Sequence, residues 1–312
     1  MRERHGVAID DTFAEAFPMK ATRVIVTAHN LTWARHAGVT ATGFATSVIG
    51  AGVEAGIERE LTPAETPDGR PGVALLFFAM SGTLLAKQLE TRLGQCVLTC
   101  PTTAVYAGFD MRNPPPGDTI ALGKNLRFFG DGWQISKVVD GKRYWRVPVM
   151  DGEFVAEETT RLIKAVGGGN LLLLARSTEA ALAAAEAAVA AMKRLPNVVM
   201  PFPGGVVRSG SKVGSKYAAL SASTNDAFCP TLRGLVAKSE LDARVASVME
   251  IVIDGLTEAD VAAAMRVGLI AATDEVGAAG GLVRISAGNY GGKLGPYLFH
   301  LHPLLAQAGA AS

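Results

Sequence analysis

The sequence predicts an α+β protein of two lobes, each with an antiparallel sheet. The order strand, helix, strand, strand, helix, strand occurs twice along the chain, and this is the pattern of a split β-α-β unit. The length of 312 residues is more than one compact core usually holds. A composition of 49% hydrophobic and 19% charged residues is typical of a chain that builds such cores. We therefore expect a duplicated arrangement, with one lobe over residues 1–149 and the other over 150–312.

The first lobe is predicted from apolar runs separated by turn signals. Residues 23–27 and 73–78 are apolar enough to be buried strands, and residues 83–93 carry leucines at helical spacing. The other predicted elements are a short helix at 33–37, a strand at 45–49, a turn-rich loop at 66–72 and a strand at 126–129.

The second lobe repeats this order. A long alanine-rich helix begins at Thr178, with Ser177 as its N-cap, and a second helix begins at Thr257. The predicted strands are residues 170–174, 198–200, 248–253 and 282–286.

The segment between the two repeats is predicted to be irregular. Residues 113–117 form a proline-rich surface loop, and residues 131–144 form a hairpin that turns at Asp140-Gly141. The lobe boundary is placed near Val149. Short echoes such as Cys-Pro-Thr at 100–102 and 229–231 agree with duplication, although the element order is the stronger evidence.

The charge balance excludes several classes of partner. A formal net charge of +1 gives no field that would recruit nucleic acid or an anionic membrane. The apolar stretch at 73–80 is far shorter than the ~20 residues that cross a bilayer. The N-terminus shows no export signal, so we expect a soluble, cytoplasmic protein.

The three cysteines indicate neither a disulfide framework nor a metal site. Cys96 and Cys100 stand at helical spacing but lack a second pair at ligand spacing, so packing in the core is favoured. The histidines are scattered, and no catalytic triad or zinc arrangement is predicted.

Two glycine-rich segments are candidate binding loops. Residues 205–212 nearly match a phosphate-binding loop, but serine precedes lysine and no helix pattern follows, which argues against a nucleotide triphosphatase. The overlapping segment 209–216 suits the recognition of carboxylate or phosphate, and its candidate residues are Ser209, Ser211, Lys212 and Lys216. In the second segment, at 288–295, they are Asn289 and Lys293. A solvated linker and a tight turn remain the alternatives.

Glu250 is the most informative single residue, because it interrupts the otherwise apolar strand at 248–253. An ionised carboxylate in such a strand costs several kcal/mol unless it is paired. Glu250 must therefore find donors, or raise its pKa and carry a proton, which is a property of catalytic acids and bases. A solvent-facing strand or a structural ion pair are the alternatives.

Six segments together resemble formylmethanofuran:tetrahydromethanopterin formyltransferases. The segments are residues 11–18, 93–103, 128–132, 210–217, 250–255 and 287–295. The resemblance spans nearly the whole chain. It implies two ferredoxin-like lobes and a homo-oligomer, dimer or tetramer, with ligand sites near the subunit contacts.

The resemblance also implies a reaction and a site. A formyl group moves between the amine of methanofuran or methylofuran and N5 of tetrahydromethanopterin, through a tetrahedral intermediate and with no tightly bound cofactor or metal. Glu250 matches the family's acid/base carboxylate. Residues 210–217, which include Tyr217, and residues 223–225, which include Thr224 and Asn225, match its substrate cleft.

The charge-balanced, alanine-rich chain resembles the versions found in methylotrophic bacteria more than the acidic archaeal ones. In those bacteria the family member is one component of a formyltransferase/hydrolase complex, which implies partner subunits. A non-catalytic structural subunit of that complex is the alternative function, and a nucleotide-dependent ligase is a third.

Overall fold

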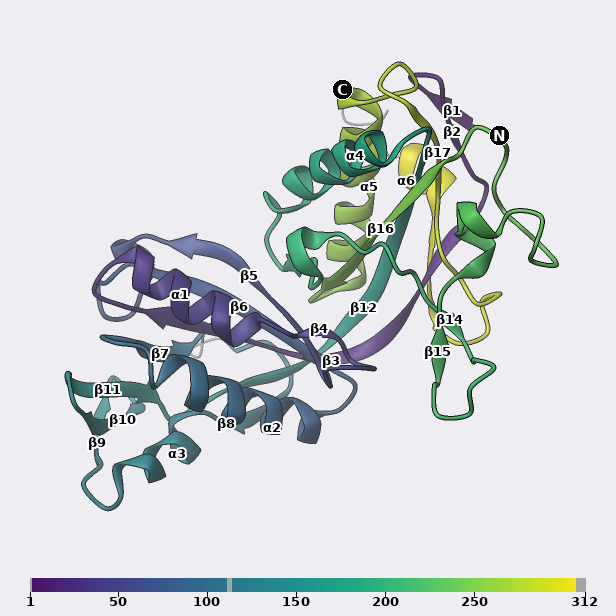
Figure 1. Ribbon diagram of the computed structural model, residues 1–312. Coiled ribbons are helices and arrows are strands. Elements are labelled where there is room, and N and C mark those ends of the chain that lie inside the picture. Colours follow the sequence, from purple (N-terminus) through teal and green to yellow (C-terminus); the bar gives the residue numbers. More distant parts are fainter. Residues whose placement is uncertain (1, 111–113, 307–312) are drawn as a thin grey trace.

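The computed structural model describes residues 2–110 and 114–306. Figure 1 shows two α+β lobes joined by two long strands, β3 (Phe13–Thr27) and β12 (Thr159–Ala175). These strands pair antiparallel where they pass from one lobe to the other, from Phe17 opposite Gly167 to Ala21 opposite Ile163. The lobe that carries α1 and α2 is called the first lobe, and the lobe that carries α4 and α5 the second lobe.

The first lobe is a sheet with the strand order β5-β6-β3-β7, in which every pair is antiparallel. Helices α1 and α2 begin at side-chain caps, because Asn30 and Ser81 each accept a hydrogen bond from a backbone N–H three residues on. The elements are β5 (Val53–Leu61), β6 (Gly72–Ala79), β7 (Ala104–Ala107), α1 (Leu31–Thr42) and α2 (Gly82–Arg92).

Two predicted strands of this lobe are wrong. The strand expected at 45–49 is only the two-residue β4 (Thr46–Ser47), and β5 takes its place in the sheet. Charged residues along β5, among them Glu54 and Glu58, hid its strand pattern. Residues 126–129 are not a strand but the end of α3 (Gly123–Leu126) and a 3-10 turn (Arg127–Gly130). Leu126 is buried there while the two phenylalanines after it are exposed, so the burial does not alternate as in a strand.

The sheet of the second lobe has the order β13-β16-β12-β17, again with every pair antiparallel. Counted along the chain, both sheets therefore place their four strands in the order second, third, first and fourth. The predicted N-cap Ser177 is confirmed, since its side chain accepts the Ala180 N–H at 3.2 Å, and Thr257 caps α5 in the same way. The elements are β13 (Val198–Val199), β16 (Ser247–Gly255), β17 (Leu282–Ser286), α4 (Thr178–Met192) and α5 (Glu258–Glu275).

The first residues of the chain join the second lobe. The hairpin of β1 (Arg2–Arg4) and β2 (Val7–Ile9) adds to β17, and the start of β3 pairs with β18 (Tyr297–His300). The last described helix, α6 (Leu301–Ala306), lies beside them, so the first and the last described residues are both in the second lobe (Figure 1). The sequence showed no sign of this pairing between the two ends of the chain.

Two further segments extend the lobes. The predicted hairpin is confirmed as β9 (Ile135–Val139) and β10 (Lys142–Val149), with left-handed backbone at Asp140 and Gly141. It continues through β11 (Gly152–Glu157), whereas β8 (Asp118–Ala121) pairs with β12. Residues 114–117 form an irregular loop, as predicted, and Asn113 lies outside the described residues.

Residues 200–246 form a long insertion between β13 and β16. It holds the short hairpin of β14 (Lys212–Val213) and β15 (Ala222–Ser223), together with three 3-10 turns, Pro203–Gly205, Asp226–Phe228 and Pro230–Leu232. Val207 pairs with Glu250 by two backbone hydrogen bonds of 2.7 Å. The insertion is thereby laid against the strand that carries the candidate acid/base residue.

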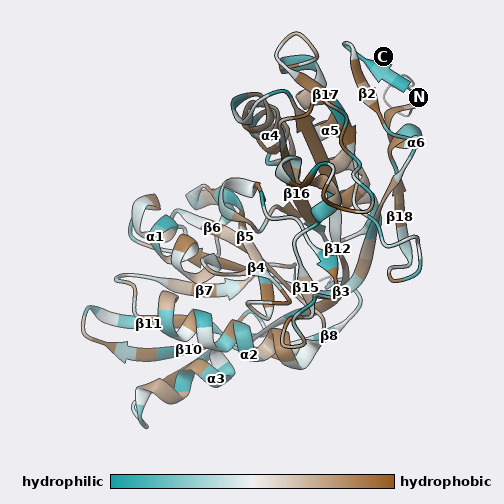
Figure 2. Ribbon diagram, turned by 45° about the vertical axis from the view of Figure 1, so that its right-hand side comes forward, coloured by the Kyte–Doolittle hydropathy of each residue, from teal (hydrophilic) through white to brown (hydrophobic). Residues whose placement is uncertain are grey.

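Each lobe has its own hydrophobic core. The apolar colouring in Figure 2 follows strands such as β12 and β16, whose inner residues pack against α4 and α5. In the first lobe Phe77 and Leu75 of β6 pack against α1 and α2, and Cys96 and Cys100 pack at the edge of that core, as predicted. Burial of these apolar side chains is the main source of stability in both lobes.

An ion pair of the first lobe is hydrogen-bonded to the second lobe. The Arg23 guanidinium of β3 donates to Glu58 of β5 at 2.6 and 2.7 Å and to the Asn197 side chain, which precedes β13, at 2.7 Å. Glu58 also accepts the Asn197 N–H at 2.6 Å. The charges are paired and hydrogen-bonded, so they can be held at the junction between the lobes.

The N-cap of α4 provides a stability test. Ser177→Ala is expected to lower the free energy of unfolding by ~1 kcal/mol, because one backbone N–H of the first turn loses its acceptor. Chemical denaturation measures this change. Ser177→Asp, which keeps an acceptor at the same place, should retain the wild-type stability, and equal loss in both variants would contradict the cap.

Within the described ranges, 2–110 and 114–306, the structure contains no helix with the length and hydropathy that a membrane crossing requires.

Candidate active site

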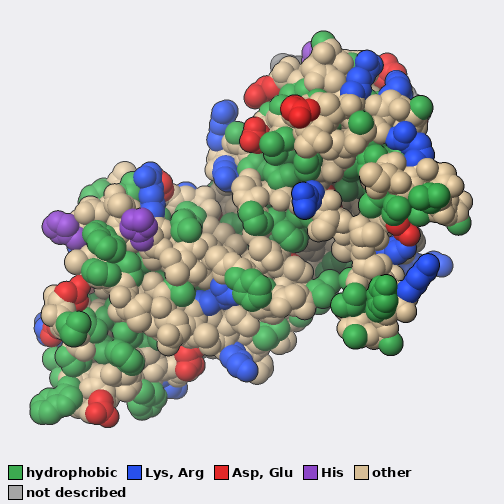
Figure 3. Space-filling view, in the orientation of Figure 1, with side chains coloured by type: hydrophobic (Ala, Val, Ile, Leu, Met, Phe, Trp, Pro, Cys, Tyr) green, Lys and Arg blue, Asp and Glu red, His purple; other side chains and the backbone are tan. Residues whose placement is uncertain are grey.

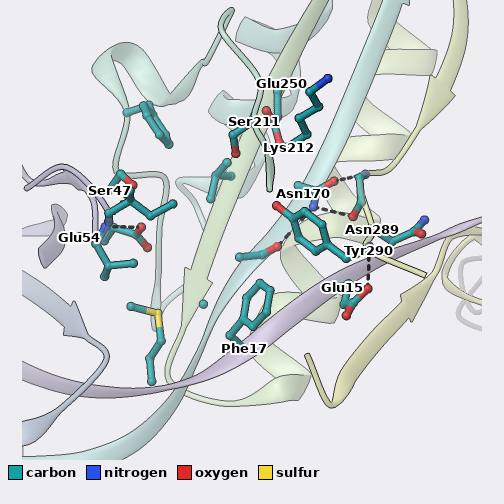
Figure 4. A pocket seen from close by; sticks show the side chains of 18 of the residues that line it. Glu15, Phe17, Ser47, Glu54, Asn170, Ser211, Lys212, Glu250, Asn289 and Tyr290 are labelled. Atoms are coloured by element: carbon teal, nitrogen blue, oxygen red, sulfur yellow. Dashed lines mark hydrogen bonds between the residues drawn. The ribbon is translucent and has the colours of Figure 1, made fainter. Parts of the chain in front are cut away.

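The cavity between the two lobes contains the candidate site. Its volume is about 240 Å³, and its wall is formed by β3, the segment after β4, β12, β16, the insertion and the loop at 288–295. In Figure 3 the surface is recessed between the lobes, and Figure 4 shows the side chains that point into the cavity. The lining includes Glu15, Phe17, Ser47, Val48, Glu54, Gly168, Asn170, Ser211, Lys212, Asn225, Glu250, Asn289 and Tyr290.

Glu250 reaches the cavity from the middle of β16. Its neighbours Ile251 and Ile253 are completely buried, whereas the Glu250 side chain is partly open to the cavity and otherwise enclosed by protein. Burial raises the pKa of Glu250 to about 7. Gly210, with a φ of +51°, lies so close that a Cβ there would be 3.7 Å from Glu250 Oε2. This carboxyl group can hold or release a proton near neutral pH.

Tyr290 lies beside Glu250 and comes from the other glycine-rich loop. Its hydroxyl group lies near Ser211. Burial, first of all, raises the pKa of Tyr290, the nearby Ser211 opposes this rise, and the Glu250 charge adds to it. The ring stands 6.1 Å from that of Phe17, centroid to centroid. Both glycine-rich loops therefore meet at the carboxyl group of Glu250.

Glu15 of β3 anchors the loop that carries Tyr290. Its side chain is 1% exposed and accepts the backbone N–H groups of Tyr290, Gly292, Leu294 and Gly295 at 2.7, 2.8, 2.5 and 2.7 Å. Burial alone would raise the pKa of Glu15, but the four donors together outweigh it and hold that pKa below its usual value. Glu15 thus fixes the loop on the strand as an ionised carboxylate.

Asn170 of β12 closes the same wall. Its side-chain oxygen accepts the Gly288 N–H at 2.6 Å, and its side-chain nitrogen donates to the Gly288 carbonyl at 3.1 Å. The start of the 288–295 loop is therefore tied to the long strand shared by both lobes, and Figure 4 shows this pair beside Tyr290.

Two family models match the chain almost from end to end. The model described as "Formylmethanofuran-tetrahydromethanopterin formyltransferase" matches residues 2–149, and the one described as "FTR, proximal lobe" matches residues 152–304. The chain belongs to this formyltransferase family.

Similar proteins agree with this family membership. The chain is 69% identical over 302 residues to the formylmethanofuran–tetrahydromethanopterin formyltransferase of Methylococcus capsulatus, covering 97% of this chain and 99% of the relative. It is 53% identical to a subunit of the formyltransferase/hydrolase complex of Methylorubrum extorquens, covering 98% of each.

Two solved structures are similar over nearly their full length. The formyltransferase of Methanosarcina barkeri has a TM-score of 0.90 at 46% identity, covering 97% of this chain and 100% of the other. The formyltransferase/hydrolase complex of Methylorubrum extorquens, solved with methylofuran, has a TM-score of 0.91 at 52% identity, covering 96% and 97%. The α+β architecture predicted for this family member is therefore confirmed.

The structure brings some of the predicted site residues of this formyltransferase to the cavity. Ser211, Lys212, Asn225 and Asn289 line it together with Glu250. Two of them have protein partners already: Lys212 forms an ion pair of 2.5 Å with Asp226, and Asn289 donates to Thr12 and Phe13 at 3.2 Å.

The other predicted residues lie outside the cavity of the single chain. Ser209 lines a small adjoining pocket that also touches Glu250, and Thr224 donates to the Ser209 carbonyl at 3.1 Å. Lys216, Tyr217 and Lys293 are in exposed parts of the two loops, and Tyr217 is 73% exposed.

Several lining residues were missed in the sequence. Glu54 stands among apolar residues of β5, so the reasoning applied to Glu250 would have found it once β5 was recognised as a strand. Glu15 and Phe17 lie in the segment 11–18, which stood out only for its resemblance to the family. Tyr290 lies in the glycine-rich segment 288–295, of which only Asn289 and Lys293 were named. No sequence signal marked Asn170.

No group of three or more histidine, cysteine, aspartate or glutamate side chains in the described part of the chain is arranged to hold a metal ion. What the cavity does offer is a carboxyl group that titrates near neutrality, hydroxyl groups and one ammonium group. These suit proton transfer and the binding of polar ligands.

The Tyr290 hydroxyl provides a test of this site. Tyr290→Phe is expected to lower kcat/KM for formyl transfer about fivefold, because a hydrogen bond worth ~1 kcal/mol next to Glu250 is lost. Steady-state kinetics measures the change. Tyr144→Phe, in β10 far from the cavity, is the matched control, and equal activity of both variants would show that the Tyr290 hydroxyl is not part of the site.

Proposed function

We propose that this formyltransferase moves a formyl group between N5 of tetrahydromethanopterin and the amine of methanofuran or methylofuran, with Glu250 as acid and base. The observation that carries this proposal is the position of Glu250, partly buried in the interlobe cavity with a pKa of about 7. The names of relatives that are 47–69% identical support the same reaction.

The chemistry requires two proton transfers. The attacking nitrogen adds to the formyl carbon, which becomes tetrahedral, and this nitrogen must then lose its proton. The departing alkylamine is too basic to leave as an anion, so it must gain a proton. Glu250 populates both protonation states near pH 7, so it takes the first proton as a carboxylate and returns it as a carboxylic acid.

The remaining predicted residues are proposed to bind the carriers. Ser211 and Asn225 offer hydrogen bonds beside the reacting groups. Lys212, Lys216 and Lys293 are proposed to face carboxylate or phosphate groups of the carriers. Ser209, Tyr217, Thr224 and Asn289 complete the walls of an extended cleft. The exposure of Lys216, Tyr217 and Lys293 is consistent with contacts made to long ligands at its mouth.

We further propose that the lobes at 1–149 and 150–312 are two ferredoxin-like units derived by duplication. The common strand order, β5-β6-β3-β7 and β13-β16-β12-β17, supports this. The pairing of residues 2–16 with strands of the second lobe is then an addition to the duplicated pattern.

The assembly is proposed to be a homo-oligomer, dimer or tetramer, in the cytoplasm, within a complex with hydrolase subunits. The name of the Methylorubrum extorquens relative supports such a complex. So do the hydrophobic side chains exposed at the far end of the first lobe (Figure 3). Phe128, Phe129 and Trp133 there are 65%, 69% and 80% exposed, which is typical of a protein contact surface.

A transfer assay tests the function. Purified protein is mixed with formyl-tetrahydromethanopterin and a methanofuran analogue, and the loss of the formyl pterin is followed spectrophotometrically. We expect turnover by the isolated chain. No turnover alone, together with an active complex that keeps its rate when Glu250→Gln is incorporated, would favour a structural subunit instead.

A further inference from the structure

We infer that Glu54 and Asp254 share one proton across the junction of the lobes, and that this pair positions the two cavity segments that its outer oxygens hold. This inference rests on the proposed function only where it is tested by measuring formyl transfer. Neither residue carries out the chemistry assigned to Glu250, so both are positioning residues.

The pair joins one lobe to the other. Glu54 stands on β5 of the first lobe and lines the cavity, whereas Asp254 stands on β16 of the second lobe, opposite Gly167 of β12 and Val199 of β13. The two carboxyl groups face each other closely enough for each to influence the pKa of the other. The two residues are 7% and 0% exposed, respectively, so bulk solvent hardly reaches the pair.

The outer oxygen of each carboxyl group already holds a backbone donor. Glu54 Oε1 accepts the Val48 N–H at 3.0 Å, and Asp254 Oδ1 accepts the Gly168 N–H at 3.1 Å. Val48 and Gly168 both line the cavity, on opposite lobes. If the pair moves apart, these two wall segments move with it.

The inner oxygen of Asp254 requires a proton in the pair. Oδ2 is buried, and no N–H or O–H group of the described residues donates to it. A buried acceptor left without a donor is strongly disfavoured. Two ionised carboxylates in contact would add repulsion, whereas one proton between them turns the same contact into a strong hydrogen bond.

The surrounding backbone leaves room for this contact and for nothing larger. A Cβ added at Gly167 would lie 2.8 Å from Asp254 Oδ1 and 1.9 Å from Met19 Sδ. Gly168 has a φ of +93° at a bulge in β12, which turns its N–H toward Asp254. The glycine pair at 167–168 is thus shaped around the Asp254 carboxyl group.

No cation among the described residues neutralises the pair. Burial, first of all, raises the pKa of both residues, and the effect is greater for Asp254, which also faces the Glu54 charge. Arg23 is already committed to Glu58 on the far part of β5. The other titratable side chains that line the cavity with Glu54 are Glu15, Lys212, Glu250 and Tyr290.

The sign of the pH effect follows from the raised pKa values. An unfolded chain releases both protons above the usual carboxyl range, while the folded pair keeps one. The stability of the wild-type protein therefore falls as the pH rises from that range toward the folded pKa of the pair. A variant with a permanent donor in the pair escapes this loss.

Amide variants provide the sharpest test. In Glu54→Gln the amide oxygen still accepts the Val48 N–H and the amide nitrogen donates to Asp254. In Asp254→Asn the amide oxygen still accepts the Gly168 N–H and the amide nitrogen donates to Glu54. Each single variant mimics the one-proton state, whereas the double variant places two donors face to face.

The experiment compares melting temperature from pH 5 to 9, steady-state kinetics and carboxyl infrared bands. We expect Glu54→Gln and Asp254→Asn to keep kcat/KM within about threefold of wild type and to flatten the pH dependence of the melting temperature. Glu54→Ala should lower kcat/KM about 10- to 100-fold, since both wall segments lose their fixed positions. The double amide variant should melt below either single variant.

The infrared arm reads the proton directly. At pH 9, where Glu250 is ionised, a protonated carboxyl band should be present in wild type and absent from the double variant. Glu60→Gln, on the same strand but exposed, is the control and should leave the band, the activity and the pH profile unchanged.

Three results would overturn the inference. The first is an equal loss of kcat/KM in Glu54→Gln and Glu54→Ala. The second is a protonated carboxyl band at pH 9 that is still present in the double variant. The third is a melting temperature of the single amide variants that depends on pH as in wild type. A wild-type protein without transfer activity would instead contradict the proposed function, because the melting and infrared arms need no turnover.

Discussion

Glu250→Gln is expected to lower kcat for formyl transfer by about 10²- to 10⁴-fold, the usual contribution of a general acid or base. The amide keeps the size and the hydrogen-bonding oxygen of the side chain but cannot exchange a proton. The effect should fall on kcat rather than KM, because the lost interaction belongs to the transition state. Single-turnover kinetics with both carriers measures it.

The stability of the same variant at different pH values shows whether it is correctly folded. The folded protein keeps the Glu250 proton up to a pKa of about 7, whereas an unfolded glutamate loses it near 4.5. Wild type therefore loses stability as the pH rises between these values, and the glutamine variant does not. At pH 8 we expect the inactive variant to be more stable than wild type by ~3 kcal/mol. An inactive and less stable variant would point to misfolding rather than lost chemistry.

Glu15→Ala is expected to have the largest effect of the residues outside the chemistry. It leaves four backbone N–H groups of the 288–295 loop without their acceptor, and an unsatisfied buried donor costs ~1–3 kcal/mol. We expect the free energy of unfolding to fall by about 3 kcal/mol or more, and activity to fall because Tyr290 loses its position. Chemical denaturation and steady-state kinetics measure the two effects.

Glu15→Gln separates the charge from the shape. It keeps one oxygen acceptor but puts an NH₂ group against two backbone donors, so its loss should lie between wild type and alanine. The contribution of Glu15 to the stability of the protein also depends on pH. Its folded pKa is depressed, so its stabilisation is present above the usual glutamate pKa and disappears as the pH falls below it. Full stability of Glu15→Ala at neutral pH would contradict the anchoring role.

The sequence pattern was sufficient for the main helices and for the strands of the second lobe, and it drew attention to one residue that lines the cavity. The strand at 73–78 is uniformly apolar because both of its faces are covered. The caps Ser177 and Thr257 act through neighbours three residues away. Glu250 drew attention because an ionised carboxylate in an otherwise apolar strand costs free energy unless it is paired.

What the sequence did not reveal depends on partners distant in the chain. β5 has polar residues at 54 and 58 because Asp254 and Arg23 meet them there, and both partners are recognisable only in the folded protein. The same holds for Glu15, since its four donors lie more than 270 residues away. The short apolar run at 126–129 failed for a simpler reason, because periodicity over four residues does not separate a strand from a helical turn.

The central claim is that a single carboxyl group in the interlobe cavity exchanges its proton near neutral pH. Difference infrared spectroscopy of wild type against Glu250→Gln, recorded from pH 4 to pH 9, titrates this group directly. The account predicts a midpoint of about 7. A midpoint near the 4.5 of an ordinary glutamate would contradict it.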